Sequence, residues 1–305
     1  MIQADSISKV YKDCVALKEF SCEILQPCIT GLLGANGAGK STVMKILSGC
    51  LAPSWGSARI AGYDILSQSQ KARSQIGYAP ETMPLYQDMK VNEYLEYVGC
   101  LKNVPPFWLT KNIIKILEEC CLGEVYKKKI GHLSKGYRQR LGLAQAILGD
   151  PSILIVDEPT SALDPVQIIE TRNLLKKLGQ KKCILLSTHI LSEVEQICDQ
   201  VIILHKGKIV LQGNLPSLLN SNKLVLTFKK NVQDALEKIQ NIKGIANIER
   251  FCENTLYIFF QQGSDPYFKI QELCELFQWP VLYFGYSQTT LEEIYVQATH
   301  TEKVV

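Results

Sequence analysis

The 305-residue sequence predicts an α/β protein with a parallel sheet, followed by a small α+β domain. Short apolar runs such as residues 153–156 alternate with segments of helical period such as residues 165–179, which is typical of a doubly wound α/β core. After about residue 216 the expected order of elements becomes β-α-β-β-α-β, the order of a ferredoxin-like module. Because the length suits about two domains, we place them at residues 1–215 and 216–305.

The N-terminal part combines short strands with an early helix. The run from Ser41 to Cys50 has helical period, with Val43, Ile46 and Leu47 on one face. Pro105-Pro106 must interrupt the helical region further along. Up to residue 122 we expect strands at 6–12, 16–25, 28–34 and 57–65, and helices at 41–50, 91–101 and 109–122.

The remaining elements first continue the alternation of strands and helices and then form the small α+β domain. A hairpin is expected at 200–213, turning at Lys206-Gly207. Before it we expect strands at 153–156 and 183–189 and helices at 165–179 and 190–199. In the C-terminal domain we expect strands at 223–230, 244–251, 254–262 and 279–287, and helices at 232–241, 265–278 and 290–300.

The composition excludes several classes of protein. A net charge of +3 is too weak and too evenly spread to indicate a nucleic-acid partner. The 11 cysteines form no Cys-x-x-Cys pair, so they indicate neither a zinc site nor a disulfide framework and fit a reducing cytosol. No stretch approaches the ~18 apolar residues of a spanning helix, and the N-terminus lacks an apolar signal segment. We therefore expect a cytoplasmic protein that meets a membrane only through a partner.

A glycine-rich loop at residues 34–42 fits the phosphate-binding pattern G-x-x-x-x-G-K-[ST], which indicates a P-loop NTPase. Glycines let backbone N–H groups close on phosphate oxygens, and the following helix N-terminus attracts anions. Lys40 would reach the outer phosphates and the Ser41 hydroxyl would bind Mg²⁺. The alternative, a flexible glycine loop, does not explain the strand before it and the helix after it. The candidate nucleotide-binding residues are Gly34, Asn36, Gly37, Ala38, Gly39, Lys40, Ser41 and Thr42.

Two carboxylates follow the apolar strand at residues 153–156. Asp157 is placed to hold magnesium, directly or through water, and Glu158 to polarise an attacking water. Alone, an acidic strand end is weak support, since many strands end in acids. Together with the phosphate loop it predicts a nucleotide-hydrolysing site.

With both motifs present, the sequence resembles the ABC ATPase family over about residues 1–215. It has elements similar to the family's own signatures, in the family's order. His189 ends the strand at 183–189 and matches the switch histidine, and Tyr11 lies where the family stacks an aromatic ring on adenine. Leu133–Arg140 (LSKGYRQR) looks like the LSGGQ signature, and Ser161–Asp164 (SALD) matches the D-loop.

The resemblance implies an ABC cassette with a RecA-like core, a helical subdomain at about residues 82–140 and an antiparallel β subdomain. Its cofactors would be ATP and Mg²⁺. Catalysis would fall to Glu158, His189 and Lys40, and magnesium would be bound by Ser41, Asp157 and Glu81. Besides the phosphate loop, ATP would be contacted by Tyr11, Glu81, Ser134, Gly136 and Asp164.

The signature element implies a second ATPase subunit, identical or different. Ser134 suits the N-cap of a helix, where a phosphate can dock, and the docked ATP would belong to the other subunit. On its own, Ser134 would be an ordinary helix cap. Lys135 replaces a signature glycine and Tyr137 replaces the glutamine, but Ser134 and Gly136 are spared, so we expect ATP docking to survive.

A further departure concerns the coupling segment. Glu81 replaces the usual Q-loop glutamine; a carboxylate can still meet Mg²⁺ through water, but its charge changes the local electrostatics. Exporter-type subunits are similar here, with glutamate before a stretch resembling residues 85–91, and the ending at residues 290–296 looks like theirs. The resemblance therefore implies the ATP-hydrolysing subunit of an exporter, peripheral on the inner face of the cell membrane, acting on a separate transmembrane permease.

Two other functions fit parts of the sequence. A soluble ABC ATPase acting on ribosomes or DNA would carry two cassettes or a long coiled coil, and neither pattern is present. A regulator that binds nucleotide without turnover, with the C-terminal module as its ligand site, is disfavoured by the intact Glu158 and His189. The transported substrate is set chiefly by the membrane subunit.

Overall fold

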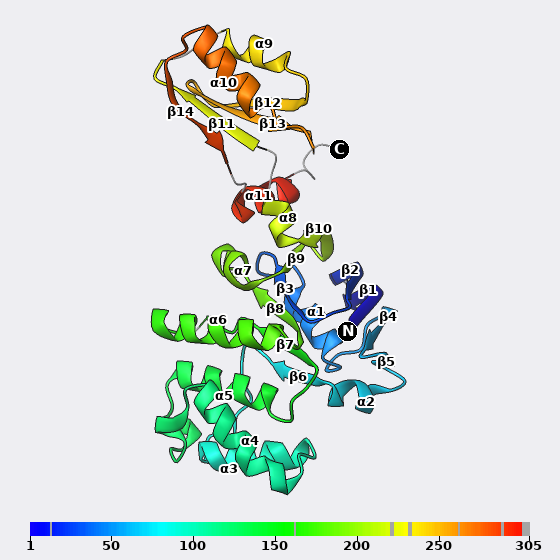
Figure 1. Ribbon diagram of the computed structural model, residues 1–305. Helices are drawn as coiled ribbons and strands as arrows, with labels where there is room; N and C mark the ends of the chain where they lie inside the picture. Colours follow the sequence, from blue (N-terminus) through cyan, green and yellow to red (C-terminus); the bar gives the residue numbers. More distant parts are fainter. Residues whose placement is uncertain are drawn as a thin grey trace. The chain divides into compact units, whose positions relative to one another are not determined.

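Figure 1 shows the computed structural model, which describes residues 1–12, 14–161, 163–219, 223–230, 234–261, 263–287 and 290–300. The chain forms two compact units. The first comprises Met1–Leu215 with a C-terminal segment from Gln297, and the second comprises Pro216–Val296. Each unit contains a separate cluster of buried apolar side chains, so each has its own core.

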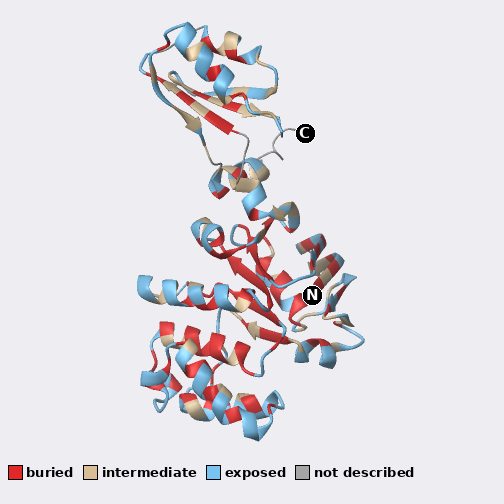
Figure 2. Ribbon diagram, viewed as in Figure 1, coloured by how far each residue is buried: buried red, intermediate tan, exposed pale blue. Residues whose placement is uncertain are grey.

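The first unit is built around a six-stranded sheet of order β10-β9-β3-β8-β7-β6. All neighbouring strands are parallel except β9 and β10, which form the predicted hairpin around Lys206 and Gly207. Strands β3, β7 and β8 are buried along their whole length (Figure 2), which explains their unbroken apolar sequences. The strands are β3 Cys28–Leu33, β6 Ile76–Ala79, β7 Ile153–Asp157, β8 Cys183–Thr188, β9 Gln200–His205 and β10 Lys208–Asn214.

An antiparallel sheet of order β2-β1-β4-β5 packs with helix α1 (Lys40–Leu47) against the core sheet. The strand expected at 57–65 is in fact two strands. Ala61 and Gly62 both adopt left-handed angles, with φ of 49° and 84°, and form a two-residue hairpin turn. The strands are β1 Ile2–Tyr11, β2 Cys14–Ile24, β4 Trp55–Ile60 and β5 Tyr63–Asp64.

Three helices between β6 and β7 pack on one another, and the third, α5, also packs on β6 and β7. α4 begins at Pro106, earlier than expected, because proline is tolerated at the first helical position, where its missing N–H is not needed. The six-residue helix α2 was not predicted, since so short a segment carries no clear period. Helix α2, Ser69–Ser74, lies before β6. The three helices between β6 and β7 are α3 Val91–Leu101, α4 Pro106–Glu119 and α5 Lys135–Ile147.

Helices α6 (Pro165–Gly179) and α7 (Leu191–Ile197) pack on the face of the core sheet opposite α1. Gly31 approaches Val194 of α7 so closely that an added Cβ would lie 3.0 Å from it, whereas the next residue, Leu32, belongs to the cluster around α1. With 15 residues, α6 is the longest described helix, and none of the described helices is long and apolar enough to span a membrane.

At Gly77 of β6, helix α5 lies directly against the strand. A Cβ built there would lie 2.2 Å from the carbonyl oxygen of Ala146 and 2.7 Å from Leu154 Cδ2. We expect Gly77→Ala to lower the free energy of unfolding by about 1–3 kcal/mol, because the helix must move away from the strand. Urea titration measures this change. Gly123→Ala is the control, since a Cβ there meets nothing within 4 Å; equal stabilities for the two variants would contradict the prediction.

The second unit folds in the order β11-α9-β12-β13-α10-β14, as the sequence predicts, and its antiparallel sheet has the order β12-β13-β11-β14. Leu224 and Leu226 of β11, Ile258 of β13 and Ile270 of α10 form its core. Its elements are β11 Lys223–Phe228, α9 Ala235–Gln240, β12 Ile245–Cys252, β13 Thr255–Phe260, α10 Tyr267–Leu276 and β14 Val281–Tyr286, with α8 Leu215–Leu219 before them and α11 Leu291–His300 after them.

Candidate active site

The phosphate loop connects the end of β3 to the start of α1, and its glycines are required by close backbone contacts. A Cβ on Gly34 would lie 2.5 Å from the carbonyl oxygen of Leu204, and one on Gly39 would lie 2.7 Å from that of Ala16. Gly39 also has a φ of 108°, which disfavours any other residue at this N-cap. The loop therefore bends tightly into a helix whose free N–H groups can bind an anion.

Lys40 is the first residue of α1 and is 7% exposed. Its Nζ donates hydrogen bonds to the carbonyl oxygens of Gly34, at 2.7 Å, and Ala35, at 3.3 Å. Both partners are neutral, so the ammonium charge is held over the loop without being neutralised there. This arrangement suits an anionic oxygen bound in the loop.

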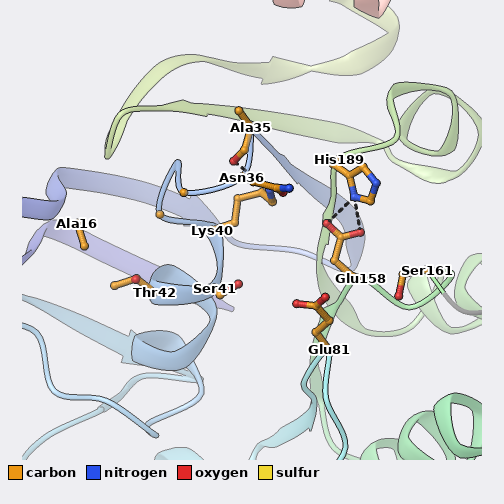
Figure 3. A pocket seen from close by; sticks show the side chains of 12 residues that line it. Ala16, Ala35, Asn36, Lys40, Ser41, Thr42, Glu81, Glu158, Ser161 and His189 are labelled. Carbon is orange, nitrogen blue, oxygen red and sulfur yellow. Dashed lines mark hydrogen bonds and ion pairs between the residues drawn. The ribbon is translucent and has the colours of Figure 1, made fainter. Parts of the chain in front are cut away.

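A cavity of about 420 Å³ opens beside this loop. Apart from Ala16 of β2, its walls come from segments that follow β3, β6, β7 and β8, that is, from the carboxyl ends of parallel strands, where ligands of open α/β sheets bind. Figure 3 shows it from close by. The lining residues are Ala16, Ala35, Asn36, Gly37, Gly39, Lys40, Ser41, Thr42, Glu81, Glu158, Ser161 and His189.

Glu158 and His189 face one another in this cavity (Figure 3). His189 Nδ1 lies 2.9 Å from Oε2 and 3.0 Å from Oε1 of Glu158. Burial raises the pKa of the Glu158 carboxyl, while the hydrogen bond and charge of His189 and the charge of Lys40 lower it. Burial has the larger effect, so the pKa of Glu158 is raised overall. A carboxylate with a raised pKa is suited to act as a general base.

Comparison with known proteins identifies the family. Residues 17–161 match the family model described as ABC transporter. The ABC transporter ATP-binding protein YxlF of Bacillus subtilis is 36% identical over 248 residues, which cover 80% of this chain and 82% of that protein. This chain belongs to the ATP-binding proteins of ABC transporters. It is the ATP-binding subunit of such a transporter, and it hydrolyses ATP.

Two further relatives extend the comparison. The bacitracin transport ATP-binding protein BcrA of Bacillus licheniformis is 30% identical over 305 residues, covering 97% of this chain and 96% of its own, so the similarity includes the C-terminal unit. A dimeric, post-hydrolysis structure of the ATP-binding cassette MJ0796 bound to ADP and Pi superposes with a TM-score of 0.66 at 25% identity, covering 70% of this chain and 99% of that one.

Some predicted site residues of this ABC ATPase lie outside the cavity lining. Tyr11, at the end of β1, is 43% exposed and does not line the cavity. Ser134 is exposed at the N-cap of α5, where its Oγ accepts a hydrogen bond from the Tyr137 N–H at 3.3 Å. Asp164 likewise caps α6 and accepts from the Gln167 N–H at 2.9 Å. Within the described residues, one chain thus assembles only part of the predicted ATP contacts.

Four further predicted residues also lie outside the cavity lining: Gly34, Ala38, Gly136 and Asp157. Gly136 is buried in the first turn of α5. Asp157 is the last residue of β7, is 3% exposed and accepts a hydrogen bond from the Ser187 hydroxyl. No group of three or more His, Cys, Asp or Glu side chains that could hold a metal ion by themselves occurs in the described part of the chain.

Sequence reasoning missed two residues that support Glu158. The Ser187 hydroxyl accepts from the Glu158 N–H at 3.2 Å while it donates to Asp157, so it fixes the strand end that carries both acids. Gln139 of α5 donates from Nε2 to the Glu158 carbonyl oxygen at 3.2 Å and is 7% exposed. A polar residue inside the apolar run at 183–188 was the available signal for Ser187; for Gln139 the sequence offered none beyond its place in the signature helix.

Proposed function

We propose that two ATPase subunits of this kind, identical or different, close around ATP and thereby drive substrate through a separate transmembrane permease. The observation that carries this proposal is that the predicted site residues fall into two groups, one inside the cavity and one outside it. Lys40, Glu158 and His189 line one cavity, whereas Ser134 and Asp164 lie exposed at the starts of two helices outside it. The dimeric state of the MJ0796 cassette bound to ADP and Pi supports a site completed by a second subunit.

In the closed dimer, the γ-phosphate of one subunit's ATP would dock at the other subunit's α5. This helix has 13 residues and begins immediately after Ser134, so its first N–H groups and dipole favour an anion. Gly136 in the first turn adds no side chain that could obstruct the phosphate. ATP would then be part of the interface, and its hydrolysis would remove the group that both subunits share.

The predicted site residues would have distinct roles. Lys40 binds the outer phosphates, and the Glu158 carboxylate accepts the proton of the attacking water. His189 orients Glu158 and meets the γ-phosphate. Tyr11 would stack on adenine, Asp164 would touch the opposite phosphate loop, and the remaining loop residues would enclose the phosphates through their backbone N–H groups.

Mg²⁺ fits the donors near the loop. The hydroxyl of Ser41 and the carboxylate of Glu81 both line the cavity, and Asp157 ends the neighbouring strand. Hard oxygen donors of this kind suit Mg²⁺, which usually takes only one or two protein ligands and shares the rest with phosphate and water. When bound, the ion would supply positive charge to the phosphate oxygens.

The dimer proposal is tested by crowding the start of α5. We expect Ser134→Arg to abolish ATP-dependent dimerisation and to lower the ATPase rate about 100-fold or more, because the bulky side chain occupies the docking point of the partner's phosphate. Light scattering with MgATP and a phosphate-release assay measure the two effects. Ser134→Ala, which loses only the cap, is the control and should lose far less. If Ser134→Arg dimerised and hydrolysed ATP like the parent protein, the shared site would be wrong.

We propose that the segment around Glu81 transmits the nucleotide state to the permease. Glu81 lines the ATP cavity, and residues 85–91 lead from it directly into α3. A segment that touches the nucleotide site at one end is suited to signal nucleotide state to a permease at the other. The similarity to BcrA, named for bacitracin transport, supports a role in transport, and we propose that the direction is export. We therefore place the working protein on the inner face of the cell membrane, attached through its permease.

We further propose that the second unit is a ferredoxin-like accessory domain, so that the cassette comprises residues 1–215 and the accessory domain residues 216–305. Its six elements follow the order β-α-β-β-α-β. Numbering its strands 1 to 4, the sheet order β12-β13-β11-β14 becomes 2-3-1-4. The two strands joined through each helix are separated by one strand between them, which is the split βαβ arrangement of that fold.

A further inference from the structure

Glu193, in the first turn of α7, carries a carboxylate that is buried and satisfied on both oxygens. The residue is 1% exposed. The Thr160 hydroxyl donates to Oε1 at 2.5 Å, and the Thr188 hydroxyl donates to Oε2 at 3.0 Å. Thr160 and Thr188 are themselves 5% and 0% exposed, so this is an interior network that water reaches little.

The two threonines flank the residues that we assign to catalysis. Thr160 lies two residues after Glu158, and Thr188 immediately precedes His189. The parallel pairing of β7 with β8 ends at Asp157 and Ser187. Beyond that point the ladder no longer joins the two segments, apart from the Glu158 N–H, which donates to the Ser187 carbonyl oxygen at 3.1 Å. The Glu158 and His189 side chains also contact one another. The Glu193 carboxylate supplies a further connection between the two backbone segments.

The Thr188 end of the connection also fixes the turn that follows β8. The Thr188 hydroxyl accepts a hydrogen bond from the Ile190 N–H at 3.1 Å while it donates to Glu193. The residues on either side of His189 are therefore joined through the Thr188 hydroxyl, which Glu193 holds in place. A histidine that is largely exposed, as the 54% exposed His189 side chain is, needs such backbone restraint to hold a defined geometry.

A buried carboxylate is costly to retain unless its interactions are specific. Arg172 of α6 places Nη2 3.5 Å from Glu193 Oε1, which partly balances the charge. An apolar side chain could fill the same interior position without that cost, but it could not hold two hydroxyls on different segments at once. Packing alone therefore does not account for a glutamate here.

We infer that Glu193 is a positioning residue, which sets the relation between the Glu158 carboxylate and the His189 ring by joining the backbone segments that carry them. This inference rests on the catalytic roles proposed above. Because Thr160 leads directly to Ser161 and Asp164, the same carboxylate also connects the segment proposed to meet the second subunit with the histidine of its own active site.

The test compares steady-state ATP hydrolysis by the full-length wild-type chain and its Glu193→Ala variant. We expect kcat to fall about 10-fold or more, since a small misplacement of reacting groups has a large effect on rate. KM for ATP should change less than about 3-fold, because the phosphate loop is untouched. Glu195→Ala, which removes an exposed glutamate from the same helix, is the matched control and should keep the wild-type kcat. An unchanged kcat in Glu193→Ala, or equal losses in the two variants, overturns the inference.

A milder pair of variants covers the chance that Glu193→Ala fails to fold. Thr160→Val keeps the side-chain shape and removes only the hydroxyl that binds Glu193, so kcat should fall while KM for ATP stays near wild type. Thr160→Ser restores the hydroxyl and should rescue kcat. Wild-type kcat in Thr160→Val, or no rescue by serine, contradicts the inference.

A double-mutant cycle with His189→Ala tests whether Glu193 acts through the histidine. In that background, Glu193→Ala should lower kcat less than about 2-fold, because the group it positions is gone. The same fold loss in both backgrounds overturns the inference. A wild-type protein without ATPase activity would instead overturn the proposed function, so the two failures are distinguishable.

Discussion

Glu158→Gln is expected to lower the rate of ATP hydrolysis about 100-fold or more, because an amide cannot take up a proton from the attacking water. The substitution preserves side-chain shape, and the amide can still meet His189, so the cavity should keep its form. ATP binding should survive, since Lys40 and the phosphate loop are unaltered. The expected product is a subunit that binds MgATP, closes its dimer and remains closed.

Two measurements separate this outcome from simple damage. Phosphate release gives the loss of turnover, and light scattering with MgATP gives the accumulation of dimer. Glu195→Gln is the control, since it makes the same chemical change at an exposed glutamate of α7. Equal ATPase rates for the wild type and Glu158→Gln would contradict the assignment of Glu158 as the general base.

The local parts of the site could be predicted from the sequence because their geometry is set by neighbouring residues. The phosphate loop needs glycines at fixed spacing and a helix directly after them, so residues 34–42 define it almost alone. The start of α5 after Ser134 is also determined by residues that are neighbours in the sequence. A capping side chain and a helical run are enough to predict that a phosphate could dock there.

The contacts that complete the site are not local, and sequence reasoning could place them only in part. Glu158 and His189 are 31 positions apart, and they meet because β7 pairs in parallel with β8. A strand order such as β9-β3-β8-β7 depends on packing across the whole unit and leaves no periodic signal. Family resemblance supplied the role of His189, whereas the contact itself comes from the fold.

Buried polar residues were the hardest to predict. Glu193 occurs in ILSEVEQICD beside Glu195, and in a helical pattern both look like solvated acids. In the structure Glu193 is 1% exposed and holds two threonines, while Glu195 is exposed. Which acid of the pair faces inward is decided by how α7 rests on β3 and β8, which is information that the sequence of one helix does not contain.

Lys40→Ala is expected to weaken ATP binding about 100-fold or more, because the variant removes a buried cation that makes charge-assisted bonds to phosphate. It also removes the hydrogen bonds from Nζ to Gly34 and Ala35, so the loop loses an internal restraint. Equilibrium binding of a fluorescent ATP analogue measures the loss. Lys45→Ala, at an exposed lysine of the same helix, is the control and should bind like wild type.

Combining the two substitutions orders the events of the cycle. If ATP binding must precede closure, the double variant Lys40→Ala with Glu158→Gln should behave like Lys40→Ala alone, with weak ATP binding and no accumulated dimer. Glu158→Gln alone should give tight binding and a stable dimer. Accumulation of dimer in the double variant at ATP concentrations that leave the loop unoccupied would show that closure does not depend on bound nucleotide, and the proposed coupling of ATP binding to closure would then be wrong.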